Sequence, residues 1–387
     1  MTKSKTARLT FVFCMALAIS SSAQTFSTLV NFDEINGAQP RSTLVIGVDG
    51  MFYGTTVGGG LANSGTFFKM TTDGALTVLY NFCSSNACTD GSYPATGAGL
   101  VQAAGSEFYG TTTGGGTVNR GTIFKITTSG ALTTLHSFSG PDGAQPYAGL
   151  VQATDGNLYG TTYFGGAEGN YGTVFKITPA GEFTTLYSFD GIIGASPYAG
   201  LMQARDGALY GTTLFAGTRG GGTIFRITTG GRLTILHNFD NQDGINPWAR
   251  LVQGSDGDLY GSTGIGGAYC SKGCGTIFKI TTSGVLTTLH SFDERDGEEP
   301  LAELVQGADG DLYGTAYYGG SDNACLDGCG TVFKITTAGE LTTLHNFHST
   351  DGAWPESGLA QTSNGELCGT TSRGGSDDEG TIFSITP

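Results

Sequence analysis

Four short apolar runs, each bounded by turn residues, repeat along most of this chain. One unit extends from Gly149 to Phe189 and reads GLVQATDGNLYGTTYFGGAEGNYGTVFKITPAGEFTTLYSF. Its runs are separated by Asp155-Gly156, Gly165-Gly166 and Ala180-Gly181. Runs of β-branched and aromatic residues separated by glycine-containing pairs are typical of consecutive antiparallel strands. The pattern therefore predicts a meander of four strands.

The Tyr-Gly-Thr-Thr core of the second run occurs seven times, intact or altered, at intervals of roughly 50 residues. The copies begin at Tyr53, Tyr109, Tyr159, Tyr210, Tyr260, Tyr313 and Cys368. The third run, Gly-Thr-(Ile/Val/Phe)-Phe, follows each of them. A period of this length indicates one supersecondary unit per repeat, stacked against its neighbours to bury a common core.

The fourth strand is expected once per unit, yet only six units carry it at their end. The missing copy is Thr25 to Phe32, TFSTLVNF, whereas the seventh unit stops after its third strand at Pro387. An N-terminal strand that completes the last sheet closes a ring and removes an unpaired sheet edge. We therefore predict an all-β fold: a seven-bladed β-propeller of four-stranded antiparallel blades, closed by the N-terminal strand.

The repeated positions also predict the core and the turns. Two phenylalanines per unit, one in the third strand and one ending the fourth, are expected to form two rings of seven buried side chains. The Asp-Gly pair between the first two strands predicts a two-residue type I′ hairpin. An Asp-Gly-x-x-Pro segment, as at Asp142 to Pro146, joins successive units and is assigned to structure.

The N-terminus has the features of a secretory signal peptide. Three cations precede an apolar run from Leu9 to Ile19, and Ser21-Ser22-Ala23 follows as a cleavage site. The apolar run is too short to span a bilayer. We expect residues 1–23 to be a signal peptide, residues 24–387 to be a single propeller domain, and the mature protein to be exported, without a membrane span.

The formal net charge of the chain is −15 at pH 7. A strongly anionic surface repels phosphate groups and anionic lipids, so nucleic acid is excluded as an expected partner. Glycine accounts for 66 of the 387 residues, but the glycines fall at fixed places in each unit. Periodic glycine indicates a turn-rich repeat protein instead of a disordered chain.

The repeats resemble those of the choice-of-anchor tandem repeat GloVer-containing proteins. The shared features are Leu-Tyr-Gly-Thr-Thr, then Gly-Gly, then Gly-Thr-(Ile/Val)-Phe-Lys-Ile and Leu-Thr-Thr-Leu-His-Ser-Phe, and they cover residues 25–387. The resemblance implies an exported bacterial repeat protein of the surface or the medium, with no established catalytic residues. Because the chain ends inside its last unit, release is expected instead of surface attachment.

Six of the eight cysteines are paired by their spacing in variable loops, and an exported protein favours local disulfides. The expected pairs are Cys83 with Cys88, Cys270 with Cys274, and Cys325 with Cys329. One zinc ion held by Cys270, Cys274, Cys325 and Cys329 is the alternative. Cys368 takes the place of the second-strand tyrosine and is expected to be a buried free thiol.

Other metal and catalytic signals are weak. His136, His237, His290 and His345 share one repeat position with tyrosine and valine, so they are interpreted as packing residues on separate blades. Acidic loops at Asp240 to Gly244 and Asp293 to Gly297 suggest calcium as an alternative, but they lack the register of an EF-hand. No cofactor is expected, and no catalytic motif is present.

Positions at which the units differ are the better candidates for function, because the fold does not dictate them. The loops after the second and fourth strands are expected to share one rim of the ring. There the predicted ligand-binding residues are Tyr147, Tyr198, Trp248, Arg250, Glu303, Tyr163 and Tyr317. Flat aromatic faces with a few polar groups suit a sugar or an extended peptide. The alternative is that these rings only cap the ends of the blades.

These features lead to two hypotheses about function. The first is a secreted monomeric binding or scaffold module without catalytic activity, engaging an extracellular polysaccharide or a surface protein through Tyr147, Tyr198 and Trp248. The second is an enzyme on the same scaffold, a polysaccharide lyase or glycoside hydrolase that uses Arg250, Glu303 and Asp296.

Overall fold

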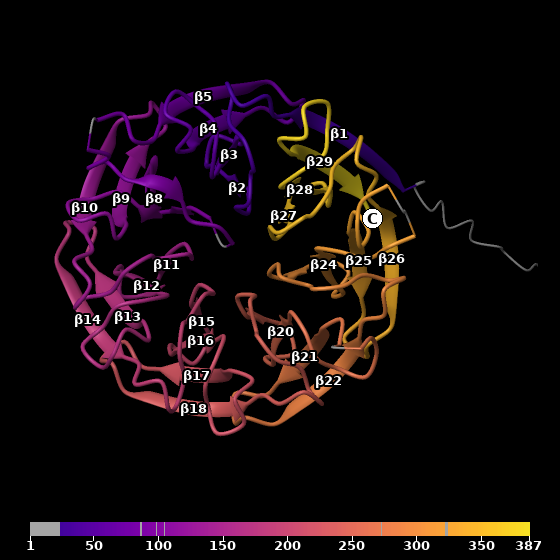
Figure 1. Ribbon diagram of the computed structural model, residues 1–387. Helices are drawn as coiled ribbons and strands as arrows, with labels where there is room; N and C mark the ends of the chain where they lie inside the picture. The colour runs from indigo at the N-terminus through magenta and orange to yellow at the C-terminus, as the bar shows by residue number, and fades with distance from the viewer. Residues whose placement is uncertain (1–23, 86, 98, 104, 272, 322–323) are drawn as a thin grey trace, which may run out of the picture.

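The chain forms a ring of seven antiparallel sheets around a central axis (Figure 1). The computed structural model describes residues 24–387 apart from residues 86, 98, 104, 272 and 322–323. The signal peptide predicted for residues 1–23 lies outside the described residues. The described part of the chain folds into 29 strands without a helix, so no helix there could cross a membrane.

Within each blade the strands run outward from the axis in chain order, except that β1 is the outermost strand of blade seven. Blades one to three contain β2 (Val45–Ile46), β3 (Phe52–Thr55), β4 (Thr66–Met70) and β5 (Leu76–Asn81); β6 (Ser92–Pro94), β7 (Val101–Gln102), β8 (Glu107–Gly114), β9 (Thr122–Thr127) and β10 (Leu132–Ser137); and β11 (Val151–Gln152), β12 (Leu158–Thr162), β13 (Thr173–Ile177) and β14 (Phe183–Ser188). Blades four to six contain β15 (Met202–Gln203), β16 (Leu209–Thr213), β17 (Thr223–Ile227) and β18 (Leu233–Asn238); β19 (Val252–Gln253), β20 (Leu259–Thr263), β21 (Thr276–Ile280) and β22 (Leu286–Ser291); and β23 (Val305–Gln306), β24 (Leu312–Ala316), β25 (Thr331–Ile335) and β26 (Leu341–Asn346). Blade seven contains β27 (Ala360–Gln361), β28 (Leu367–Thr371), β29 (Thr381–Thr386) and β1 (Thr25–Asn31).

The ring closes through β1, as the sequence predicts. This strand pairs antiparallel with β29, from Thr25 opposite Thr386 to Asn31 opposite Thr381. The first strand of the chain therefore lies beside its last strand at the outside of blade seven (Figure 1). The fold is the predicted seven-bladed β-propeller. Blade two differs only in the short additional strand β6, which pairs with β8.

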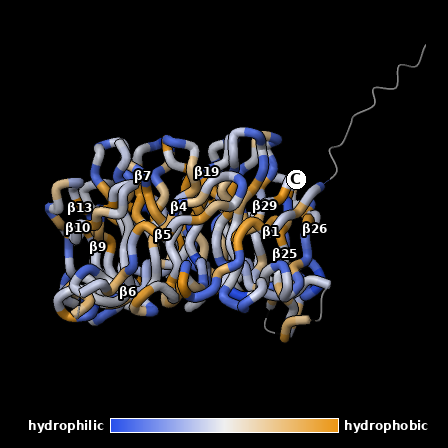
Figure 2. The backbone as a smooth tube through the Cα atoms, turned by 90° about the horizontal axis from the view of Figure 1, so that it is seen from above, coloured by the Kyte–Doolittle hydropathy of each residue, from blue (hydrophilic) through white to orange (hydrophobic). Residues whose placement is uncertain are grey.

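The two predicted sets of phenylalanines are buried, and they meet in pairs between neighbouring blades, so that seven pairs form a ring. In each blade the phenylalanine after the fourth strand contacts the third-strand phenylalanine of the next blade, with ring centroids 5.1–5.7 Å apart. Phe32 and Phe68 make the contact that joins blade seven to blade one. Figure 2 shows the resulting apolar middle layer, with polar loops at both faces.

The glycine of Tyr-Gly-Thr-Thr makes room for this ring. A Cβ atom at Gly160 would lie 2.5 Å from Cζ of Phe175, the residue opposite it on the neighbouring strand. The tyrosine before it is buried as predicted, and the Tyr159 hydroxyl donates a hydrogen bond to Asp155 at 2.7 Å. The motif is therefore structural. Cys368 occupies the tyrosine position in blade seven and is buried and unpaired.

The prediction of type I′ hairpins is wrong. At Asp155-Gly156 only the glycine has positive φ, at 81°, and its N–H donates to the carbonyl of Ala153 at 2.9 Å. This is a type I turn followed by a left-handed glycine, which is the usual three-residue hairpin. The Asp155 carboxylate caps this turn, accepting from the N–H of Asn157 at 3.0 Å.

The residue before each linker proline is left-handed in all seven blades, with φ between 51° and 58°. These residues are Gln39, Tyr93, Gln145, Ser196, Asn246, Glu299 and Trp354. At Glu299 the N–H donates to the carbonyl of Cys274 in the preceding blade, and the carbonyl accepts from Tyr317 N–H in the following blade. The segment assigned to structure thus links neighbouring blades through backbone bonds that any residue type can make.

Candidate functional site

A cavity of about 310 Å³ lies on the axis of the ring, where the linkers lead into the innermost strands. Its walls come from all seven blades, because the residues just after each linker proline converge there. The lining includes Arg41, Thr96, Ala148, Tyr198, Trp248, Arg250, Glu299, Leu301, Glu303, Tyr317 and Glu356. Five of the seven residues predicted on the rim therefore line a single cavity.

Blades three to five form an aromatic wall. The rings of Tyr147 and Tyr198 stack with centroids 5.1 Å apart, and Trp248 meets Tyr198 edge-on at 4.5 Å. Tyr147 itself does not line the cavity, and Tyr163, which packs against it at 5.3 Å, does not line it either. Burial raises the pKa of Tyr198 to about 12, and its hydroxyl shares a hydrogen bond with Thr96 at 2.9 Å. The wall is thus held by packing and remains uncharged at neutral pH.

Two ion pairs lie among the other lining residues. Arg41 Nη1 lies 3.5 Å from Glu356 Oε2, and Arg250 Nη1 lies 3.7 Å from Glu303 Oε2. The Nε atoms of both arginines are buried and have no hydrogen-bond partner among the residues that the structure describes. The Nη groups of the two arginines are hydrogen-bond donors, and the glutamate carboxylates are acceptors. The cavity therefore presents both donors and acceptors beside flat rings.

Glu356 is the most constrained of these carboxylates. Burial raises its pKa, although Arg41 and hydrogen bonds from Tyr317 and Ser372 favour the charged form. Tyr317 in turn packs against Tyr318 at 4.4 Å and against Trp354 at 5.9 Å. A carboxylic acid of raised pKa next to an aromatic hydroxyl can donate as well as accept hydrogen bonds.

Asp296 does not join this site. Its carboxylate accepts from the N–H of Asp293 at 2.9 Å and pairs with His290 at 2.8 Å, away from the cavity lining. The prediction that Asp296 acts together with Arg250 and Glu303 is therefore wrong, because only the last two line the cavity. The physical reason is that this aspartate belongs to the linker turn, where its carboxylate caps backbone groups.

The four histidines lie on the outer strands of separate blades, as predicted, but they do more than pack. Each pairs with the linker aspartate six residues later, at 2.8–3.2 Å. In blade one Tyr80 makes the same contact with Asp90 at 2.7 Å. The six-residue spacing is visible in the sequence and could have identified these pairs. They stabilise the linkers and lie on different blades, so they form no common site.

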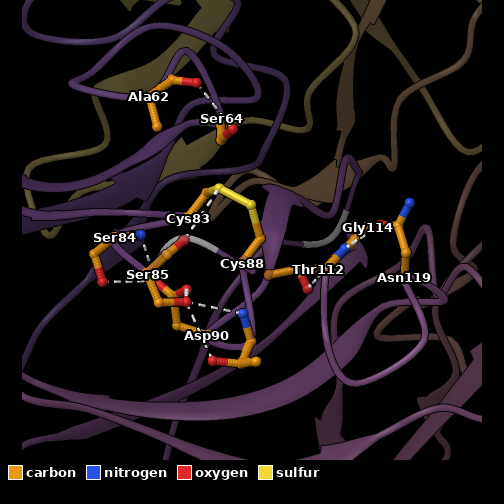
Figure 3. Close-up of a disulfide and its surroundings, with 12 residues drawn as sticks. Ala62, Ser64, Cys83, Ser84, Ser85, Cys88, Asp90, Thr112, Gly114 and Asn119 are labelled. Carbon is orange, nitrogen blue, oxygen red and sulfur yellow. Dashed lines mark hydrogen bonds between the residues drawn. A yellow bond between two sulfur atoms is a disulfide. The ribbon is translucent and has the colours of Figure 1, made fainter.

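The cysteine pairs form as predicted. Cys83 bonds to Cys88, Cys270 to Cys274 and Cys325 to Cys329. Figure 3 shows the first bridge closing a loop in which Ser84 and Ser85 bond to Asp90. With the sulfurs paired inside each loop, the four thiolates of the zinc alternative are not available.

The acidic loops suggested for calcium are occupied by turn contacts. Asp240 accepts from the N–H of Gln242 at 2.9 Å, and Asp243 accepts from the N–H of Asp240 at 2.9 Å. Within the described ranges no group of three or more His, Cys, Asp or Glu side chains could hold a metal ion.

Four lining residues with polar or charged side chains were not predicted, namely Arg41, Thr96, Glu299 and Glu356. Arg41 and Glu356 occupy the same post-proline position as Tyr198 and Trp248, so the alignment of the repeats already contained the signal. Glu299 precedes a proline and lies outside the aligned post-proline position. Its left-handed backbone conformation, which the sequence does not show, distinguishes it in the structure. Thr96 belongs to blade two, whose linker is longer than the others, and it reaches Tyr198 in blade four.

Fold and cavity together define a class of protein: a closed seven-bladed propeller whose repeats vary around an axial cavity. The Gloeobacter/Verrucomicrobia repeat matches residues 11–206 and 202–387, two tandem matches that cover most of the chain. The chain belongs to this repeat family, which is the family that the sequence motifs resemble. A search of curated proteins found no match.

Solved structures share the architecture at low sequence identity. The extracellular domain of a protein from B. thetaiotaomicron, described as a hybrid two-component system, superposes with a TM-score of 0.59 at 12% identity, covering 94% of this chain and 41% of that one. This chain therefore spans less than half of that structure. A protein from Bacteroides fragilis described as a 6-phosphogluconolactonase has a TM-score of 0.50 at 20% identity, covering 79% and 84%. At such identities the likeness shows the fold alone.

Proposed function

We propose that this propeller is an exported binding module that takes a sugar unit of an extracellular glycan into its axial cavity. The observation that carries the proposal is the convergence of Tyr198 and Trp248 with two arginine–glutamate pairs in one cavity of about 310 Å³. The fold does not require these residues, because other units carry alanine, leucine or glycine at the same positions.

The chemistry of the lining supports a sugar. A hydroxyl group both donates and accepts, so an arginine beside a glutamate can satisfy it in both directions. The apolar face of a sugar ring packs on an aromatic side chain, as the Tyr198 and Trp248 rings allow. Pockets of this kind combine apolar walls with a few placed polar groups.

A glycan array with the wild-type protein and the Trp248→Ala variant tests this function. We expect binding that the variant loses, because the substitution removes one side of the aromatic wall. Tyr269→Ala is the control, since it deletes an exposed aromatic side chain that does not belong to the cavity lining. Undiminished binding by Trp248→Ala, or no glycan bound by the wild type, would contradict the proposal.

A second candidate function is hydrolysis or elimination on a polysaccharide. It is favoured by one observation: Glu303 and Glu356 line the same cavity, and burial raises the pKa of Glu356. Two carboxyl groups facing one pocket, one of them with a raised pKa, are the arrangement that cleaves glycosidic bonds. Turnover of a bound glycan that disappears in Glu303→Gln would support catalysis, and binding without turnover would exclude it.

A further inference from the structure

Among the described residues, Glu299 is the one carboxylate of the axial cavity without a counter-charge. It also lines an adjoining pocket of about 500 Å³ with Glu294, Glu298 and Asp327. In the part of the chain that the structure describes, none of these four carboxylates forms an ion pair. The charges of Arg41 and Arg250, by contrast, are offset by Glu356 and Glu303.

Three features of Glu299 destabilise the folded protein. Its φ of 54° is a conformation that glycine adopts at lower cost. Burial raises the pKa of the Glu299 carboxyl group, and the nearby charge of Glu298 raises it further, so the charged form is disfavoured in this position. Its side chain makes no hydrogen bond with any described residue, and its two backbone bonds do not depend on residue type. The carboxylate therefore brings the fold no compensating contact.

The residues around Glu299 indicate which kind of ligand would offset these free-energy costs on binding. Trp248 and Tyr317 line the same cavity, and aromatic faces attract cations. A metal ion is disfavoured, because the described side chains include no group that could hold one. An ammonium group fits better, since it pairs with one carboxylate while its carbon frame contacts the rings.

We propose that the axial cavity selects sugars that carry a free, protonated amino group, with Glu299 as the carboxylate that pairs with it. This inference rests on the proposed glycan-binding function and assigns its specificity. Arg41 and Arg250 with their glutamates hold the hydroxyl groups, and Glu299 distinguishes an amine from its neutral acetylated form.

Calorimetric titration with two probes tests the assignment: oligomers of β-1,4-linked glucosamine and of N-acetylglucosamine, equal in length, at a series of pH values from mildly acidic to neutral. We expect the free amine to bind at least about tenfold more tightly, which corresponds to about 1.4 kcal/mol. Glu299→Gln should abolish this preference. Glu340→Gln is the matched control, because it removes the same charge from an exposed position in a hairpin turn outside the cavity.

The outcomes separate the two proposals. If acetylated or neutral glycans bind at least as well as the amine, the selectivity is wrong and the glycan-binding function stands. If no glycan binds, both are wrong. A melting temperature of Glu299→Gln below that of the wild type would show that the carboxylate supports the fold, and it would overturn the inference. An unchanged or higher melting temperature with lost amine preference would support it.

Discussion

The closure of the ring can be tested by replacing the phenylalanine that joins its ends. Phe32 is fully buried, its ring lies 5.7 Å from that of Phe68, and its N–H donates to the carbonyl of Gly380 at 3.0 Å. Phe189 has the same surroundings in blade three, away from the closure. Its ring lies 5.5 Å from that of Phe225, and its N–H donates to the carbonyl of Gly172 at 3.0 Å. Phe32→Ala and Phe189→Ala are therefore a matched pair.

Either substitution removes a fully buried phenylalanine, at a cost of about 3–5 kcal/mol. The difference between the two lies in connectivity. The strand before Phe189, β14, follows β13 through a tight turn, whereas β1 reaches its partner β29 only across the whole ring. We expect Phe32→Ala to detach β1 selectively, raising its opening equilibrium by at least roughly a hundredfold.

Hydrogen exchange measured by mass spectrometry provides the assay. In Phe32→Ala the amides of β1 and of its partner β29 should exchange faster while blades two to five keep their protection. In Phe189→Ala no comparable single-strand opening is expected. Equal acceleration of exchange in all blades of Phe32→Ala would refute the reasoning, because it would show that the ring opens only by global unfolding.

Two further predictions concern the linkers. The pKa of Asp142 is lowered because hydrogen bonds from Ser139 and His136 outweigh the effect of burial. Its stabilising contribution is therefore present above the unfolded pKa of about 3.9 and is lost as pH falls through the lower folded value. Asp142→Asn should lower the free energy of unfolding at neutral pH and weaken its decrease at acidic pH. Urea unfolding at a series of pH values measures both, and an unchanged decrease at acidic pH would contradict this role of Asp142. Gln145 has a φ of 51°, so Gln145→Gly should raise the free energy of unfolding by up to about 1 kcal/mol, and a loss of stability would show that its side chain matters.

Much of this protein was determined by local sequence alone. Strand order, blade number and the closing strand follow from counting, because each run is short, bounded by turn residues and repeated. The disulfides follow in the same way, since bridging across four or five residues depends on local geometry. The turn type was missed because an Asp-Gly pair suits both the two-residue and the three-residue hairpin.

The cavity required the tertiary structure. Repeat alignment places Tyr198, Trp248 and Glu356 at one position of different blades, but only closure of the ring brings them around one axis. In the sequence, Asp296 looked as suitable for the site as Arg250 and Glu303. In the structure its carboxylate bonds to His290 and to the backbone of its own turn, so it does not reach the cavity. These residues lie far apart in the chain, and the distances between them depend on how the seven sheets pack around the axis. Local sequence therefore determines the blade, and the assembly of the blades determines the site.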